Sequence, residues 1–344
     1  MNLVTGGTGL LGSHLLLDLA LAGERVRAIY RDQRSTARTR RVFGYYLDSP
    51  DPVFSRIEWV KADLLDRGAL EDALEGVTVV YHCAAMVSFD PCQREELIRV
   101  NVGGTENLVD LSVENRIKKF CHVSSIATLG RPGDGGLMTE ESYWIPSNRN
   151  SAYSISKYGA EREVWRGMEE GLEAVIINPS VILGPGFWET GSALFRLIGH
   201  GFPFYPAGSN GFVDVRDVSR AMIALAVGSF SRQRFLCSAG NLTYRELFTL
   251  IARAVGRPAP QYRAGRFLSS MAWRTERLRS LATGRPPAIT RELALTAGMR
   301  YAYDGDKLSK AIHLNYNSID LVVARTGRLF QSDRATRLTN SANQ

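Results

Sequence analysis

Three glycines near the N-terminus constrain the fold of this chain more than any other feature. The apolar run Leu3-Val4-Thr5 leads into a glycine-rich turn, and an apolar helical pattern follows from His14 to Leu21. A strand, such a turn and a helix in this order bind dinucleotide phosphates, because glycine allows the tight turn and the close approach of backbone to phosphate. The spacing GxxGxxG is one residue off the commoner fingerprint, and an ordinary strand-to-helix turn is the alternative. We expect the phosphate site to be formed by Gly6, Thr8, Gly9, Leu10, Leu11 and Gly12.

The order of strand and helix repeats along the first half of the chain. Short apolar runs at 25–30, 56–61, 77–85, 119–123 and 173–178 alternate with helical patterns. This alternation predicts an α/β fold with a Rossmann-type, doubly wound parallel sheet. A chain of 344 residues has room for two domains of about 150 residues each. We expect a dinucleotide-binding domain of residues 1–180 and 211–240, a smaller mixed substrate-binding domain of residues 181–210 and 241–331, and a disordered tail at 332–344.

The composition is that of an ordinary globular protein, with 44% hydrophobic and 22% charged residues. No apolar run approaches ~18 residues, so we expect no membrane span and no secretion signal. The four cysteines form no CxxC pair, and the five histidines are scattered without ligand spacing. We therefore expect buried free thiols, a cytoplasmic location and no bound metal.

The net charge of +7 would favour partners that carry negative charge. Eight arginines lie between Tyr262 and Arg300, against only Glu276 and Glu292. A solvated helix face is the favoured interpretation, and an anionic substrate or a membrane surface is the alternative. Nucleic acid is the weakest of these partners, because no recognisable nucleic-acid-binding module is present.

The end of the second predicted strand, Tyr30-Arg31-Asp32, lies where the adenine ribose of a dinucleotide is read. An acidic residue usually bonds the ribose hydroxyls, but the strand tip here is Tyr30 and Arg31 follows directly. Guanidinium groups bind phosphate in a bidentate fork, so Arg31 as first contact and Arg38 as second favour the 2′-phosphate of NADP(H). Asp32 leaves NAD(H) as the alternative.

Two further strands end in residues that suit a ligand. Asp63 follows one strand, at the carboxyl edge where ligands gather in open α/β sheets, although it would equally serve as a helix N-cap. Ala84 and Ala85 end the next strand, and their small side chains allow a cofactor to pass closely or simply pack well.

Tyr153 and Lys157 are four residues apart in a helical pattern, so their side chains share one helix face. A phenol titrates near pH ~10, and a neighbouring cation lowers an acid's pKa by ~1–3 units. We therefore expect Lys157 to bring the Tyr153 phenolate within reach of neutral pH, so that Tyr153 serves as general base or general acid. A plain solvated helix face is the alternative.

Taken in order, these motifs resemble the extended short-chain dehydrogenase/reductase family over about residues 1–240. The resemblance rests on the glycine turn, Asp63-Leu64, Ala84-Ala85, Asn101, Ser124-Ser125, the Tyr153–Lys157 pair and Asn178-Pro179-Ser180. Within the family the chain is most similar to the dihydroflavonol reductase and hydroxysteroid dehydrogenase branch. The resemblance implies three catalytic residues, Ser125, Tyr153 and Lys157. It also implies cofactor contacts at Asp63 and Leu64 for the adenine, at Lys157 for the nicotinamide ribose, at Pro179 and Ser180 for the nicotinamide, and at Ser124, which is the backup for Ser125.

The sequence thus favours an NADP(H)-dependent oxidoreductase that acts on a carbonyl or secondary alcohol of a fairly apolar small molecule. An NAD-dependent nucleotide-sugar epimerase or dehydratase is the alternative, and Arg216 is its only motif-adjacent candidate for binding a pyrophosphate. A non-catalytic dinucleotide sensor is a second alternative, which the retained Tyr153, Lys157 and Ser125 disfavour. Family resemblance makes a homodimer an expectation.

Overall fold

The computed structural model describes residues 1–130, 136–147, 150–283 and 290–342. The chain divides into two compact units. The first unit is formed by Met1–Ser180, Val215–Cys237 and Asp304–Asn315, and the second by Val181–Asp214, Ser238–Tyr303 and Tyr316–Gln344.

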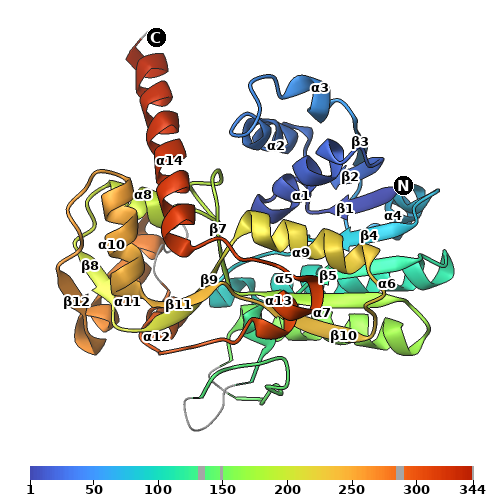
Figure 1. The fold of residues 1–344 in the computed structure, drawn as a ribbon. Helices are drawn as coiled ribbons and strands as arrows, with labels where there is room; N and C mark the ends of the chain where they lie inside the picture. Colours follow the sequence, from blue (N-terminus) through green and yellow to red (C-terminus); the bar gives the residue numbers. More distant parts are fainter. Residues whose placement is uncertain (131–135, 148–149, 284–289, 343–344) are drawn as a thin grey trace. The chain divides into compact units, whose positions relative to one another are not determined.

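The first unit is built on a seven-stranded sheet in which neighbouring strands pair in parallel (Figure 1). The strand order β10-β6-β5-β4-β1-β2-β3 means that the chain winds outward from β1 in one direction and from β4 in the other. The predicted doubly wound parallel sheet is therefore confirmed. The carboxyl ends of β1 and β4 flank the switch point, where ligands bind in such sheets. The strands are β1 Asn2–Thr5, β2 Val26–Tyr30, β3 Ile57–Lys61, β4 Val79–His82, β5 Lys119–Val123, β6 Ala174–Pro179 and β10 Gln233–Cys237.

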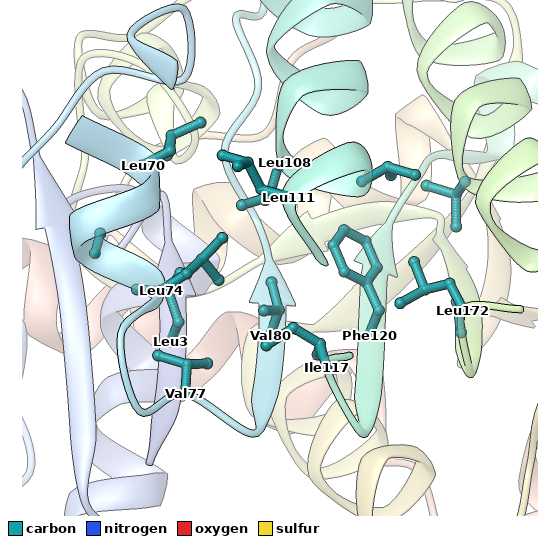
Figure 2. Close-up of a cluster of buried hydrophobic side chains, with 14 of the residues drawn as sticks. Leu3, Leu70, Leu74, Val77, Val80, Leu108, Leu111, Ile117, Phe120 and Leu172 are labelled. Atoms are coloured by element: carbon teal, nitrogen blue, oxygen red, sulfur yellow. The ribbon is translucent and has the colours of Figure 1, made fainter. Parts of the chain in front are cut away.

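Helices cover this sheet because its strands are apolar on both faces. Leu3, Val80 and Phe120 are fully buried on one face of the sheet (Figure 2). Side chains of three helices cover them, among them Leu70 and Leu108. Burial of each such side chain stabilises the fold by about 1.5–3 kcal/mol. The helices of the first unit are α1 Leu10–Leu21, α2 Thr36–Phe43, α3 Asp51–Phe54, α4 Arg67–Leu74, α5 Arg94–Ile98, α6 Gly104–Glu114, α7 Ala152–Glu169, α9 Val215–Val227 and α13 Asp306–Ile312.

The second unit is smaller and mixed. β9 Ser209–Asp214 lies between β7 Val181–Leu183, which is parallel to it, and β11 Gly240–Thr243, which is antiparallel. Thr243 and Glu246 form a capping box that starts α10, and the helix buries Leu247, Phe248, Ile251 and Ala252. The remaining elements of this unit are α8 Ala193–Gly199, β8 Phe204–Pro206, α10 Tyr244–Ala254, β12 Tyr262–Ala264, α11 Arg266–Thr283, α12 Arg291–Ala297 and α14 Ile319–Ala342.

The structure differs from the expected boundaries in three places. β9 pairs with β7 and β11 and not with the large sheet, so residues 211–214 and 238–240 belong to the second unit. Residues 304–315 join the first unit, because Lys307 donates a hydrogen bond to the Arg234 carbonyl of β10 at 2.9 Å. The expected disordered tail is helical through Ala342, and Trp188 Nε1 anchors this helix by donating to Asp333 Oδ2 at 2.7 Å. Residues 343–344 lie outside the described part.

Candidate active site

The glycine turn joins β1 to α1 and has no space for side chains at two of its positions. Gly6 has φ +69°, and a Cβ there would lie 2.6 Å from the Ala84 nitrogen. A Cβ on Gly12 would lie 2.2 Å from the Gly6 carbonyl oxygen, so Gly12 lets α1 pack on the turn. Gly9 is the N-cap of α1 and supplies no side-chain cap. The first turn of α1 is therefore left for an outside acceptor, as a phosphate site requires.

The other predicted cofactor residues around this turn differ in exposure. Thr8, Leu10 and Ala84 are half-buried and Ala85 is exposed, whereas Leu11 is buried in the core. The Ala84 nitrogen donates to the hydroxyl of the threonine that ends β1, at 3.2 Å. This bond holds the carboxyl ends of β1 and β4 together at the switch point.

At the tip of β2, the Asp32 carboxylate is bound by a neighbouring arginine within the chain. Asp32 caps the following 3₁₀ turn by accepting from the Arg34 nitrogen at 3.0 Å, and it forms an ion pair with the Arg34 guanidinium, also at 3.0 Å. The hydrogen bond from the Arg34 side chain lowers the pKa of Asp32. Arg31 and Arg38 are exposed. Thr39, next to Arg38, is buried and donates to the Gly7 carbonyl at 2.9 Å, which fixes α2 to the glycine turn.

Asp63 and Leu64 shape the loop after β3. Asp63 is half-buried, and its Oδ1 accepts from the Leu65 nitrogen at 3.0 Å. Asp63 is therefore not the helix N-cap, because Asp66 caps α4. Leu64 is buried, and its carbonyl accepts from Asn107 Nδ2 at 3.0 Å.

Tyr153 and Lys157 lie on one face of α7, whose N-terminus is capped by Ser151. The Ser125 side chain lies near the Tyr153 hydroxyl and lowers its pKa, and the Tyr153 ring packs on Phe89 at a centroid distance of 5.6 Å. Lys157 is almost fully buried and donates from Nζ to the Val123 carbonyl at the end of β5, at 2.8 Å. The fold thus brings the three predicted catalytic side chains to the carboxyl edge of β5.

The pKa expectation for this pair was wrong. Burial raises the pKa of Tyr153 above its usual value, and the nearby Ser125 side chain offsets only part of this effect. Burial lowers the pKa of Lys157 to about 8, against the opposing charge of Glu161. The Lys157 ammonium is bonded to the Val123 carbonyl, so it does not stabilise a phenolate on Tyr153. Tyr153 is accordingly a neutral phenol at neutral pH, the form that donates a proton.

The two adjacent serines have different surroundings. Ser124 is buried, and its hydroxyl donates to Glu161 Oε2 at 2.5 Å. Ser125 is half-exposed, its hydroxyl accepts from the Ala127 nitrogen at 3.1 Å, and its side chain lies near the Tyr153 hydroxyl. The Ser124 hydroxyl is therefore engaged in the interior, and the Ser125 hydroxyl is the one beside the phenol.

Glu161 is a site residue that sequence reasoning missed. It is 1% exposed and lies one helical turn beyond Lys157. Oε2 accepts from Ser124, from Thr128 at 2.8 Å and from Asn178 at 2.9 Å, and Oε1 accepts from Arg234 at 3.1 Å. We call these five residues the Glu161 cluster. It ties α7, the serine loop, β6 and β10 together directly behind Ser125 and Lys157.

A sequence signal for Glu161 does exist. Its spacing continues the stripe of Tyr153 and Lys157 by another four residues, which predicts a carboxylate on the same face as the lysine. Its partner Arg234 lies in β10, and no spacing rule connects residues 73 positions apart.

Asn101 fixes the start of α7 from another direction. It donates from Nδ2 to Ser156 Oγ and to the Met86 carbonyl, both at 2.9 Å, and it accepts from the Met86 nitrogen at 2.7 Å. Ser156 in turn donates to the Tyr153 carbonyl at 2.9 Å. Asn101 therefore links the loop after β4 to the helix turn that carries Tyr153.

Pro179 and Ser180 end β6 at the same edge of the sheet, and both are buried. The Ser180 nitrogen donates to the Cys237 carbonyl at 2.9 Å. Among the residues that the structure describes, the buried Ser180 hydroxyl has no hydrogen-bond partner. An orphaned buried hydroxyl costs free energy, so it marks a place for an outside partner.

Comparison with known proteins agrees with this geometry. A protein of Synechocystis sp. named "Putative dihydroflavonol 4-reductase" is 30% identical, over 96% of this chain and 94% of its own length. Sterol demethylase protein B of Methylococcus capsulatus is 31% identical, over 76% of each chain. A solved nucleoside-diphosphate-sugar epimerase from Pseudomonas aeruginosa matches with a TM-score of 0.74 and 23% identity, over 96% of this chain and 97% of that one.

The sheet order and the glycine turn define the class of Rossmann-fold, dinucleotide-dependent enzymes. The chain belongs to the NAD dependent epimerase/dehydratase family, whose model matches residues 2–230. This is the extended short-chain dehydrogenase/reductase family of NAD(P)-dependent reductases, dehydratases and epimerases, so the predicted resemblance is confirmed. No helix in the described part of the chain is both long and apolar enough to cross a membrane.

Proposed function

We propose that this enzyme reduces the carbonyl group of a fairly apolar small molecule with NADPH, and oxidises the corresponding alcohol in reverse. The observation that carries the proposal is the neutral Tyr153 phenol, which lies beside the Ser125 side chain and is followed on the same helix face by Lys157. The names of the Synechocystis and Methylococcus relatives, a reductase and a sterol demethylase component, support an oxidoreductase and an apolar substrate.

The residues present fit a dinucleotide. A side chain at Gly6 or Gly12 would collide with backbone, and Gly9 leaves the α1 N-terminus uncapped, so the turn suits a pyrophosphate. The unpartnered Ser180 hydroxyl suits the carboxamide end of the cofactor. When bound, the reduced nicotinamide supplies a hydride to the carbonyl carbon.

The proton reaches the carbonyl oxygen from the chain. Tyr153 donates its phenolic proton to the oxygen as negative charge develops there, and Ser125 donates a second hydrogen bond to the same oxygen. Loss of this proton leaves a phenolate, which the nearby Ser125 hydroxyl stabilises while the proton is replaced from solvent. The alcohol product then leaves.

Preference for NADPH rests on the tip of β2. The Asp32 carboxylate is neutralised by Arg34, which reduces its repulsion of a 2′-phosphate. Arg31 and Arg38 are both exposed there, and the Thr39–Gly7 bond holds α2 against the phosphate turn. Two guanidinium groups at this tip supply the charge that a 2′-phosphate needs.

Two measurements test this proposal. Tyr153→Phe is expected to lower carbonyl reduction by at least ~10²-fold and to leave NADPH affinity nearly unchanged, because the phenol acts on the substrate. Arg31→Ser with Arg38→Ser is expected to weaken NADPH binding by at least ~10-fold and to spare NADH binding, in titrations of nicotinamide fluorescence. The control is Arg56→Ser, an exposed arginine before β3. Retained turnover in Tyr153→Phe, or equal NADH and NADPH binding by the parent protein, would refute the corresponding part.

The epimerase alternative has a specific point in its favour, the fold similarity to the Pseudomonas epimerase. Its candidate for binding a pyrophosphate, Arg216, forms an ion pair with Asp18 at 2.5 Å and stacks over the Tyr46 ring at 4.7 Å. This arginine is therefore engaged within the first unit, and we favour the reductase. Stabilisation of the purified protein by a sugar nucleotide, and not by NADPH alone, would reverse the choice.

A further inference from the structure

The segment 262–300 holds most of the excess positive charge of the chain. It contains eight arginines and two glutamates, so it accounts for six of the seven net positive charges. Among its described arginines, Arg263, Arg274, Arg277, Arg291 and Arg300 are exposed. The reductase chemistry proposed above uses none of them.

Large apolar side chains are exposed in this same segment. Tyr262 and Leu295 are each 60% exposed and Leu278 is 68% exposed. Four more are exposed by 37–47%, namely Leu268, Met271, Leu293 and Met299. The segment therefore exposes arginines and large apolar side chains together. A helix face that only contacts solvent would not need the apolar side chains to be exposed.

Helix α11 shows the pattern most clearly. Leu268, Met271 and Leu278 are spaced by three and seven residues, so they lie on one face of the helix. None of the α11 side chains that the structure describes is buried. The contrast is α10, which turns Leu247 and Ile251 into the core. Among the described residues, those around α11 thus leave its apolar stripe between 38% and 68% exposed.

Arginines flank this stripe. Arg274 lies over the Trp273 ring at 4.9 Å, and Arg277 is exposed one turn further along. Such a helix, with apolar residues beside arginines, has the composition of helices that lie in a membrane interface. A second copy of this surface is a poor partner, since two strongly positive faces repel.

We propose that α11, together with the exposed arginines of the 262–300 segment, docks this protein on an anionic membrane surface. The apolar stripe enters the headgroup region, and the arginines bind lipid phosphates. The proposal does not depend on the reductase assignment. It does give an enzyme with an apolar substrate direct access to the phase in which such substrates dissolve.

The test is co-sedimentation of the full chain with vesicles. Phosphatidylcholine vesicles that contain phosphatidylglycerol are expected to bind the protein, and vesicles of phosphatidylcholine alone are expected to bind it much more weakly. Binding should fall as salt rises from about 0.05 M to about 0.5 M. Arg274→Ser with Arg277→Ser should weaken binding about 30-fold, at roughly tenfold for each 1.4 kcal/mol.

A second variant tests the apolar stripe. Leu268→Ser with Met271→Ser and Leu278→Ser should weaken binding at least ~10-fold. The matched control replaces exposed apolar residues elsewhere, Leu197, Val227 and Leu321, by serine. The charge control is Arg56→Ser with Arg94→Ser, which lowers net charge equally outside the segment. Both controls should bind as the parent does, and every variant should keep the parent's circular dichroism and melting temperature.

Three results would overturn the proposal. One is equal binding to both kinds of vesicle. Another is full binding by the apolar variant with loss in the arginine variant, which would indicate an acidic protein or a nucleic acid as the partner. The third is equal weakening by the charge control, which would mean that net charge alone attracts the protein.

Discussion

Replacement of Glu161 by leucine tests whether the Glu161 cluster holds the serine loop. Glu161 is 1% exposed, and its pair Arg234 keeps only 14% of its side chain exposed. Removal of one partner from a buried ion pair typically costs about 3–5 kcal/mol, because the other charge is left uncompensated. Ser124, Thr128 and Asn178 lose an acceptor as well. We expect Glu161→Leu to lower the free energy of unfolding by about 4 kcal/mol.

The assay is urea unfolding followed by tryptophan fluorescence, with the midpoint and slope fitted together. Glu163→Leu is the matched control on the same helix, since its partner Arg166 is 36% exposed and such pairs contribute about 0–1 kcal/mol. Arg234→Leu alone should resemble Glu161→Leu. The double variant should lose less than the sum of the two, because no uncompensated charge remains.

The reasoning fails if Glu161→Leu costs no more than Glu163→Leu, or if the losses at Glu161 and Arg234 simply add. Either result would mean that water reaches the pair. Retained stability with lost activity would show that Glu161 acts only through Lys157.

Further predictions concern the lysine and the glycine turn. Because burial lowers the pKa of Lys157 to about 8, its ammonium loses a proton as pH rises through about 8. The charged group that the family resemblance assigns to the nicotinamide ribose is then lost, so the reduction rate should fall over the same range. In the unfolded chain this lysine titrates near pH ~10.4, so between about pH 8 and pH ~10.4 the unfolded chain binds more protons than the folded chain. The free energy of unfolding should therefore rise with pH over this window. Lys157→Met should remove both effects, as measured by pH–rate profiles and by urea titrations at several pH values. Gly12→Ala should abolish NADPH binding in fluorescence titrations, since its Cβ would lie 2.2 Å from the Gly6 oxygen, whereas Gly240→Ala, with nothing within 4 Å, should bind normally. Equal behaviour of the two glycine variants would contradict the packing argument.

The sequence predicts the large parallel sheet because its signals are local. Apolar runs, glycines and helical spacing each act over a few residues, and the alternation of strands with helices favours a parallel, doubly wound sheet. The Tyr153–Lys157 pair was found for the same reason, since four residues make one helix turn.

The smaller unit was harder to predict. The unit is assembled from three separate stretches of chain. Strand β9 pairs with β7 and β11 and not with the large sheet, through hydrogen bonds that no local pattern encodes. The helical state of 332–342 also depends on a distant side chain, because Trp188 anchors Asp333.

The sequence by itself determined the glycine turn, the doubly wound sheet and the pairing of Tyr153 with Lys157 on one helix face. Only the tertiary structure decided their chemical states. Burial in the fold raises the pKa of Tyr153. Lys157 donates a hydrogen bond to the Val123 carbonyl, and Ser124 donates one to the buried Glu161 carboxylate. The physical reason is that spacing along a helix sets which side chains share a face, whereas desolvation and hydrogen bonding depend on what the rest of the fold packs against that face.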